Sequence, residues 1–205
     1  MNKAKFTLAF LVIFIFSQLE AQVRIGLRGS VSITNLTKAH SISKSRTGFQ
    51  FGALGLIPLD RNDQLFFVPE IQYSMQGEYN VHQPTKPTDY PEEKDIKTFS
   101  GNINLPLNLR FYISSLESDF FIEGGPYLGF LIDENIERIE NTEPFDEEMA
   151  GFDFGLNLGG GYSFNRSFEI SLRYYYGFPD QVKHDAADAI NHNSILNFGL
   201  SYVFY

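Results

Sequence analysis

The stretch that most constrains the fold is Ile103–Ile132, where two alternating runs flank a short polar turn at Ser114–Asp119. In each run every second residue is apolar, so one face of an extended chain is continuously hydrophobic. A period of two with one apolar face is typical of a β-hairpin. The stretch therefore predicts two antiparallel strands. The fold then depends on whether the apolar face of the sheet contacts lipid or a protein core.

The same alternation recurs in eight segments, each about 10 to 14 residues long, the length of a tilted strand that crosses a bilayer. The segments are Gln22–Ser32, Gly48–Ile57, Leu65–Gly77, Asn102–Ile113, Asp119–Ile132, Gly151–Asn165, Ser167–Gly177 and Ser194–Tyr205. Short connections (Pro58–Gln64, Ser114–Ser118, Asn165–Ser167) alternate with long polar ones (Ile33–Thr47, Glu78–Gly101, Asp133–Ala150, Phe178–Asn193). No helical period of similar strength competes, although Ile132, Ile136 and Ile139 fit one helical turn.

The two faces of these segments differ in bulk and in charge. One face carries large apolar and aromatic side chains, and aromatic residues make up 16% of the chain. The other carries glycines, small polar residues, four arginines and four acids. Because eight strands leave a lumen only just wide enough for side chains, the polar face fits inside and the bulky face fits lipid. We therefore expect an all-β, eight-stranded antiparallel transmembrane β-barrel, an up-and-down meander of the outer-membrane type. A soluble barrel or sandwich is the alternative.

The first residues have the pattern of a secretory signal. Lys3 and Lys5 precede the apolar run Phe6–Phe16, and a plausible cleavage site follows. A run of this length is too short to span a bilayer, and no other run approaches the roughly 20 residues of a transmembrane helix. We expect a signal peptide at residues 1–21 and one outer-membrane barrel domain at residues 22–205.

Composition excludes several classes of protein and site. The chain has no cysteine, which excludes disulfides, a lipoprotein anchor and thiolate metal sites. The formal net charge is -9, and losing Lys3, Lys5 and Glu20 with the signal removes +1, which leaves -10 for the mature chain. An acidic balance of this kind argues against nucleic acid as a partner.

Several pieces of sequence carry a resemblance to a known family. They are VPEIQYSMQG at Val68–Gly77, NINLPLNLRFYI at Asn102–Ile113, EGGPYLGFLI at Glu123–Ile132, FDFGLNLGGGYSF at Phe152–Phe164 and LRYYYGF at Leu172–Phe178. Their order and spacing resemble the PorT-like family of porin-like outer-membrane β-barrels from Bacteroidetes-type bacteria, over most of the mature chain. The resemblance implies a barrel in the outer membrane of a Gram-negative bacterium, and the name-giving members act in type IX protein secretion. It implies no catalytic residues, only the structural positions Glu70, Pro106, Gly125, Pro126, Asp153 and Gly155.

The sharpest candidate site is a charged network on the expected inner face. Its members are Arg24, Arg28, Glu70, Arg110, Glu123, Asp153, Glu169 and Arg173. Four cations opposite four anions can neutralise one another in a narrow lumen, whereas unpaired buried charge is costly. We expect a structural salt-bridge plug that fills a closed barrel. The alternative is a charged constriction that conducts or excludes ions.

The long loops hold weaker candidates. All four histidines fall there, and a divalent metal or a rim active site could use His184, Asp185, Asp188 and His192, with His40 and His82 elsewhere. The loop Asp133–Glu148 carries eight acids against Arg138 alone and could attract Ca²⁺, Mg²⁺ or a basic partner. Solvated loops are the simpler interpretation of both patterns. We therefore expect no metal site, no cofactor and no catalytic residue.

These patterns lead to a ranked set of functions. We expect a non-enzymatic barrel with a structural or interaction role, including an accessory role in type IX secretion or envelope assembly. The alternatives are a narrow passive porin-like channel and a rim-site lipid-modifying or hydrolytic enzyme. Expected partners are outer-membrane lipid, other envelope or secretion proteins, and the outer-membrane assembly machinery. The aromatic last strand, ending at Phe204 with Tyr205 beyond the pattern, is typical of a chain delivered to that machinery.

Overall fold

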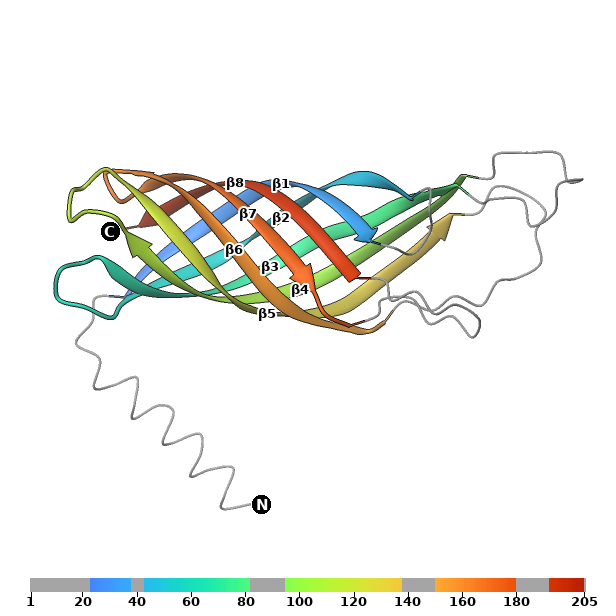
Figure 1. The fold of residues 1–205 in the computed structure, drawn as a ribbon, viewed down its shortest axis with the longest axis horizontal. Coiled ribbons are helices and arrows are strands. Elements are labelled where there is room, and N and C mark those ends of the chain that lie inside the picture. The colour runs from blue at the N-terminus through green and yellow to red at the C-terminus, as the bar shows by residue number, and fades with distance from the viewer. Residues whose placement is uncertain (1–22, 38–42, 82–94, 138–149, 180–191, 205) are drawn as a thin grey trace, which may run out of the picture.

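The computed structural model describes residues 23–37, 43–81, 95–137, 150–179 and 192–204. They form the strands β1 (Arg24–Thr37), β2 (Ser43–Pro58), β3 (Leu65–Val81), β4 (Asp95–Tyr112), β5 (Asp119–Glu137), β6 (Phe152–Phe164), β7 (Phe168–Gly177) and β8 (His192–Phe204). Each strand pairs antiparallel with its neighbours in sequence, and β8 pairs with β1 to close the barrel (Figure 1). This confirms the predicted fold class. No described segment is a helix with the length and apolar character needed to cross a bilayer.

Several expectations concern residues outside these described ranges. They are the signal peptide at residues 1–21, the terminal Tyr205, the loop residues His40, His82, His184, Asp185 and Asp188, and the acidic loop from Arg138 to Glu148.

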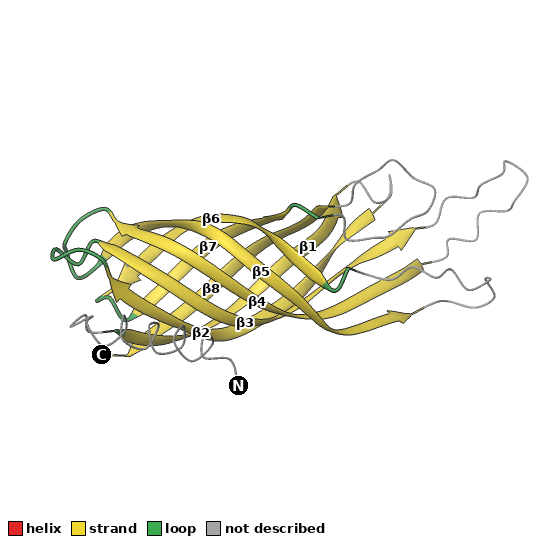
Figure 2. Cartoon of the chain, turned by 90° about the horizontal axis from the view of Figure 1, so that it is seen from below, coloured by secondary structure: helices red, strands yellow, loops and turns green. Residues whose placement is uncertain are grey.

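The strands extend further toward the long loops than the alternation predicted. The expected loop boundaries at Glu78–Gly101 were wrong, because β3 continues to Val81 and pairs there with Asp95, the first residue of β4. Main-chain pairing does not require alternating side chains, so a strand can continue past the point where the sequence pattern ends. Figure 2 shows these strand ends protruding opposite the short turns.

The helical turn suggested by Ile132, Ile136 and Ile139 is also wrong for its described part. Ile132 and Ile136 lie in β5, and Ile136 pairs with Thr98 of β4. The extended ladder with β4 satisfies the main chain here, so local apolar spacing does not decide the structure.

The inner and outer faces separate as predicted. Outward side chains such as Phe51, Leu158 and Phe198 are 60%, 72% and 55% exposed, whereas Arg110 and Arg173 inside the barrel are 0% exposed. An apolar surface on all sides is far larger than the apolar patches of soluble proteins and is typical of a lipid-facing barrel. The soluble alternative, with the aromatic face as a core, is therefore wrong for this chain.

Glycines let neighbouring strands approach closely at several points of the barrel wall, and one of these lies where β4 meets β5. A Cβ atom built at Gly125 would overlap the main-chain carbonyl oxygen of Leu107 on β4. Regular pairing between the two strands is interrupted between Pro106 and Leu109, opposite Pro126, which has no N–H to donate. Asn157 on β6 donates through Nδ2 to the Gly125 carbonyl oxygen at 3.0 Å, so a lumen side chain satisfies part of this irregular wall.

Candidate functional site: a filled lumen and its polar mouth

The centre of the lumen holds a chain of alternating arginine and glutamate side chains. Arg110 on β4 donates to Glu123 on β5 (Nη2–Oε2 2.7 Å) and across the lumen to Glu169 on β7 (Nη1–Oε2 2.8 Å). Arg173 on β7 contacts the other oxygen of Glu123 and binds Glu70 on β3, with Nη1 at 2.9 Å from Oε2. All five side chains are 0% exposed. We call these five residues the central ion chain.

Arg28 on β1 balances the charge of the central ion chain. Its guanidinium donates to Asn197 Oδ1 at 3.1 Å and to Ser201 Oγ at 3.4 Å. Gly199 makes room for it, because a Cβ atom at that position would collide with the guanidinium. With Arg28, the buried centre holds three arginines and three glutamates, so it has no net charge, which limits the cost of its desolvation.

Neutral side chains add hydrogen bonds to the central ion chain. The hydroxyl of Tyr112 donates to Glu169 Oε1 at 2.7 Å, and Arg173 Nη1 donates to the Tyr175 hydroxyl at 3.3 Å. Gln72 donates to Glu70 from the same strand. A buried ion pair is stable only when its remaining donors and acceptors are also satisfied, and these contacts meet part of that requirement.

The structure brings together six of the eight charged residues singled out in the sequence, and Arg24 and Asp153 lie apart from them. Arg24 sits near the short turns, with Nη2 at 3.2 Å from Asp63 Oδ2. Asp153 lies toward the long loops and accepts a hydrogen bond from Tyr127. Alternation in the sequence gives the face of a residue and not its depth along the barrel.

An apolar cluster that the sequence analysis missed closes the lumen toward the short turns. Its members, which we call the apolar plug, are Leu54, Leu56, Phe66, Val68, Tyr112, Phe121 and Val203, each at most 3% exposed. The Tyr112 ring packs edge-on against Phe66 and Phe121, with centroids 5.6 and 5.5 Å away. The Arg110 guanidinium lies 4.2 Å from the Phe121 ring centroid. The apolar plug therefore rests directly on the central ion chain.

A sequence signal for the apolar plug does exist. At Leu56–Ile57, Phe66–Val68 and Phe120–Phe121 the bulky apolar residues occupy consecutive positions, so both faces of the strand are hydrophobic. At least one member of each such group must point inward. Loss of alternation at strand ends that face short turns thus indicates an apolar lumen at that end.

Arg166, in the turn between β6 and β7, ties the short turns together. Its guanidinium donates to three main-chain carbonyls, of Leu116 (3.0 Å), Ser114 (3.1 Å) and Asp63 (3.2 Å). Its guanidinium carbon also lies 3.6 Å from the centroid of the Tyr112 ring. Arg166 therefore joins three turns and covers the apolar plug. No side-chain pattern in the sequence could reveal it, because its hydrogen-bond acceptors are main-chain atoms.

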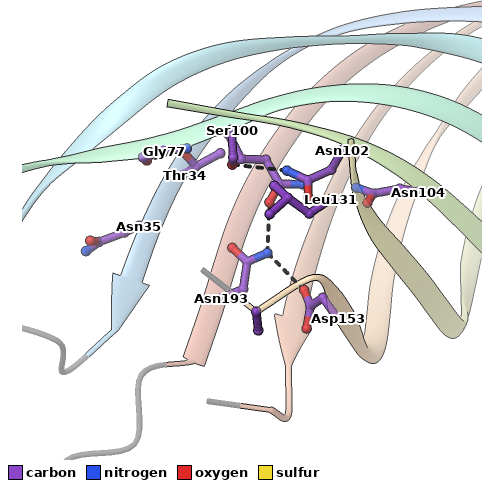
Figure 3. Close-up of a pocket in the computed structure, with 11 residues that line it drawn as sticks. Thr34, Asn35, Gly77, Ser100, Asn102, Asn104, Leu131, Asp153 and Asn193 are labelled. Carbon is purple, nitrogen blue, oxygen red and sulfur yellow. Dashed lines mark hydrogen bonds between the residues drawn. The ribbon is translucent and has the colours of Figure 1, made fainter. Parts of the chain in front are cut away.

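The long-loop end of the lumen opens into a small polar pocket, which we call the mouth pocket (Figure 3). Its lining residues are Thr34, Asn35, Gln76, Gly77, Ser100, Asn102, Asn104, Leu131, Ala150, Asp153 and Asn193. Asn193 Nδ2 donates to Asp153 Oδ2 at 3.0 Å and to Gln76 Oε1 at 2.9 Å, and the Tyr127 hydroxyl donates to the same Asp153 oxygen at 2.8 Å. About 20 Å³ is open to the centre of a water molecule, room for a water or one small polar group.

Among the histidines, His192 is the one within the described ranges. It begins β8, is half-buried, and its ring centroid lies 5.1 Å from that of Tyr176. The described residues contain no group of three or more histidine and acidic side chains arranged to hold a metal ion. The metal and rim-site alternatives thus depend on loop residues outside the described ranges.

Comparison with known proteins gives one sequence family and a set of similar folds. The family model described as outer membrane protein beta-barrel domain matches residues 16–182. No curated protein sequence matches the chain. Among solved structures, Neisserial surface protein A aligns with a TM-score of 0.45 at 11% identity, over 89% of this chain and 97% of that protein. The outer membrane protein OprG from Pseudomonas aeruginosa aligns with a TM-score of 0.46 at 14% sequence identity, over 89% of this chain and 94% of OprG. The outer membrane enzyme PagL aligns with a TM-score of 0.48 at 10% sequence identity, over 86% of this chain and 98% of PagL.

Proposed function

Because this chain belongs to the family of outer membrane protein β-barrel domains, we propose that it is a closed, non-conducting barrel with a structural or interaction role. It resides in the outer membrane of a Gram-negative bacterium. Residues 1–21 direct export as a signal peptide, and residues 22–205 form the mature barrel. The exposed apolar band contacts lipid, and the outer-membrane assembly machinery inserts the chain.

The observation that carries this proposal is the filled lumen. The central ion chain, the apolar plug and Arg166 occupy successive levels between the mouth pocket and the short turns. A hydrated ion would have to displace paired charges and then apolar rings, and an eight-stranded lumen has no spare width for this. The filling therefore favours a plugged barrel over a narrow porin-like channel.

A role in type IX secretion or envelope assembly rests on the PorT-like sequence pieces. The strand ends of β3, β4 and β5 add support, because they extend the paired main chain of the barrel toward the long loops, where other envelope proteins could be bound. The barrel is non-enzymatic in this proposal. The described polar groups at the mouth pocket are engaged mainly with one another, and none forms a nucleophile–base pair with a substrate-sized cleft.

Planar-bilayer recording tests the proposal. Folded protein is first identified on a detergent gel, where the unboiled sample runs as a compact band and boiling shifts it. We expect such protein to insert without steady conductance, while a large porin recorded in the same bilayer gives open channels. Steady ion currents from the folded protein would overturn the plugged barrel and support the porin-like alternative.

A further inference from the structure

Four buried amide side chains lie in the lumen from the mouth pocket to the central ion chain. They are Gln72 on β3, Asn104 and Asn108 on β4, and Asn157 on β6, each at most 4% exposed. We call these four residues the amide layer. Among the described residues, they hold every buried side-chain amide atom that lacks a hydrogen-bond partner. Leaving such an atom unpaired is costly, so folded proteins normally match it with a protein group or an ordered water.

The first pair of unmatched atoms lies where the mouth pocket meets the amide layer. Gln72 and Asn104 are directly opposite each other on β3 and β4. Within the described structure, Asn104 Nδ2 is a donor without an acceptor, and Gln72 Oε1 is an acceptor without a donor. Asn104 also lines the mouth pocket, whose open space has room for a water molecule (Figure 3). One water between the two amides can accept from Asn104 and donate to Gln72.

The second set of unmatched atoms lies deeper in the lumen, beside Gly125. In the part of the chain that the structure describes, Nδ2 and Oδ1 of Asn108 and Oδ1 of Asn157 all lack a partner. Because both amide atoms of Asn108 are unpaired, turning its amide over does not satisfy it. Gly125 pairs with Asn157 on β6, and a Cβ atom built at Gly125 would lie 3.0 Å from the Asn108 Cα atom. Asn108 and Asn157 thus flank a residue without a side chain, and a water there can bond to both amides.

The amide layer joins the mouth pocket to one side of the central ion chain. Gln72 Nε2 donates to Glu70, and Asn108 precedes Arg110 on the inner face of β4. The apolar plug covers the other side of the central ion chain. On that side, the residues that the structure describes leave one buried side-chain atom unpaired, the Ser163 hydroxyl. Water can therefore be held between the central ion chain and the long-loop end, and it finds few partners toward the short turns.

We propose that the amide layer binds ordered water molecules, one between Gln72 and Asn104 and one beside Gly125 between Asn108 and Asn157. Buried waters typically make about three hydrogen bonds to protein groups that would otherwise be unpaired, and these amides provide such groups. The waters form a path from the mouth pocket to the central ion chain, and the apolar plug closes this path at the short-turn end. The path requires the closed barrel and is independent of any role in secretion. Its absence would leave the proposed non-conducting barrel intact, because a dry lumen carries no ions either.

Magnetisation transfer from water, measured by nuclear magnetic resonance on the folded protein in micelles, tests the site. We expect nuclear Overhauser contacts between water and the side-chain amide protons of Asn104 and Asn108. The sign in the rotating frame distinguishes a bound water from chemical exchange. The control is the main-chain amide of Val203 in the apolar plug, which is 0% exposed, donates to the Ser167 carbonyl oxygen and should show no contact.

Three results would overturn the proposal. If neither amide shows a water contact, the buried amides bond directly to one another and the layer is dry. If Asn104 alone shows a contact, the water is confined to the mouth pocket. If Val203 also shows a contact, water enters the apolar plug and the path is not closed at the short-turn end.

Two matched variants on the same face of β4 assign the two water positions. Asn108→Leu removes both polar atoms of one amide, so it should abolish the water contact at the Asn157 amide protons and leave the contact at Gln72. Asn104→Leu should do the reverse. The same loss in both variants, or a loss in neither, contradicts the assignment. Each variant is first checked for the compact unboiled band, and the test on the unsubstituted chain stands without them.

Discussion

Glu123 is the side chain on which the charged lumen depends most, because its two oxygens bind two different arginines. Oε2 accepts from Arg110, and Oε1 accepts from Arg173. The two arginines then reach Glu169 and Glu70 on other strands. Each remaining glutamate of the central ion chain pairs with one arginine. Loss of the charge at Glu123 therefore leaves two buried cations each short of an anion.

Replacing this one carboxylate tests whether the central ion chain stabilises the barrel. Glu123→Gln keeps the volume and removes the charge, and we expect it to lower the free energy of unfolding by about 3–5 kcal/mol, the usual cost of breaking a buried pair. The measurement is urea unfolding in micelles, followed by circular dichroism because the chain has no tryptophan.

The matched control removes an exposed partner instead. Asp63, whose side chain is 57% exposed, pairs with Arg24 at the barrel end. Asp63→Asn should change the free energy of unfolding by less than about 1 kcal/mol. If Glu123→Gln costs no more than Asp63→Asn, the central ion chain is a space-filling feature without a stabilising role.

At the scale of the strands, alternation predicted all eight elements because a period of two is a direct consequence of strand geometry. The strand ends of β3 and β4 and the apolar plug were not predicted, and both omissions have the same physical cause: alternation is lost there. β3 and β4 run past the apolar band, from Leu65 to Val81 and back from Asp95, where main-chain pairing continues without any side-chain pattern. The apolar plug lies where both faces of a strand are hydrophobic, so alternation cannot tell inside from outside.

Contact between two strands explains why Gly125 cannot carry a side chain. Its missing Cβ leaves room for the Leu107 carbonyl oxygen of β4, and main-chain atoms cannot move aside as a flexible side chain can. We expect Gly125→Ala to force β4 and β5 apart and to lower stability by about 1–3 kcal/mol. The folded fraction is measured as the compact unboiled band after refolding into detergent.

Gly29 on β1 is the matched control for this substitution. It faces outward, and a Cβ atom built there would meet nothing within 4 Å. Gly29→Ala should therefore refold as completely as the unsubstituted chain. A similar loss in both variants would mean that glycine is needed for strand flexibility in general, and not for the close approach at Gly125.

At the scale of the whole molecule, closure of the barrel decides which charged side chains meet. Closure cannot be predicted from the local sequence pattern. Arg110 and Glu169 are 59 residues apart in sequence, and Glu70 and Arg173 are 103 apart. Alternation placed them on one face, but their pairing depends on strand tilt and stagger, which the sequence pattern does not contain. The same reasoning explains why Arg24 and Asp153 share that face and still lie at opposite ends.

The two ends of the barrel differ enough to predict its orientation in the membrane. Outer-membrane barrels have short turns on the periplasmic side and long loops outside, so Arg166 and the apolar plug should face the periplasm. The chain lacks cysteine, so single cysteines are unambiguous labels. Leu116→Cys lies in a short turn at a residue 66% exposed, and Gly151→Cys lies at the long-loop end, with nothing within 4 Å of its built Cβ atom.

Labelling intact cells with a maleimide too large to pass porins distinguishes the two orientations. We expect Gly151→Cys to react in intact cells, and Leu116→Cys to react only after the outer membrane is permeabilised. Both variants should react equally after permeabilisation, which controls for intrinsic reactivity. The reverse pattern would place the mouth pocket in the periplasm and contradict the predicted orientation.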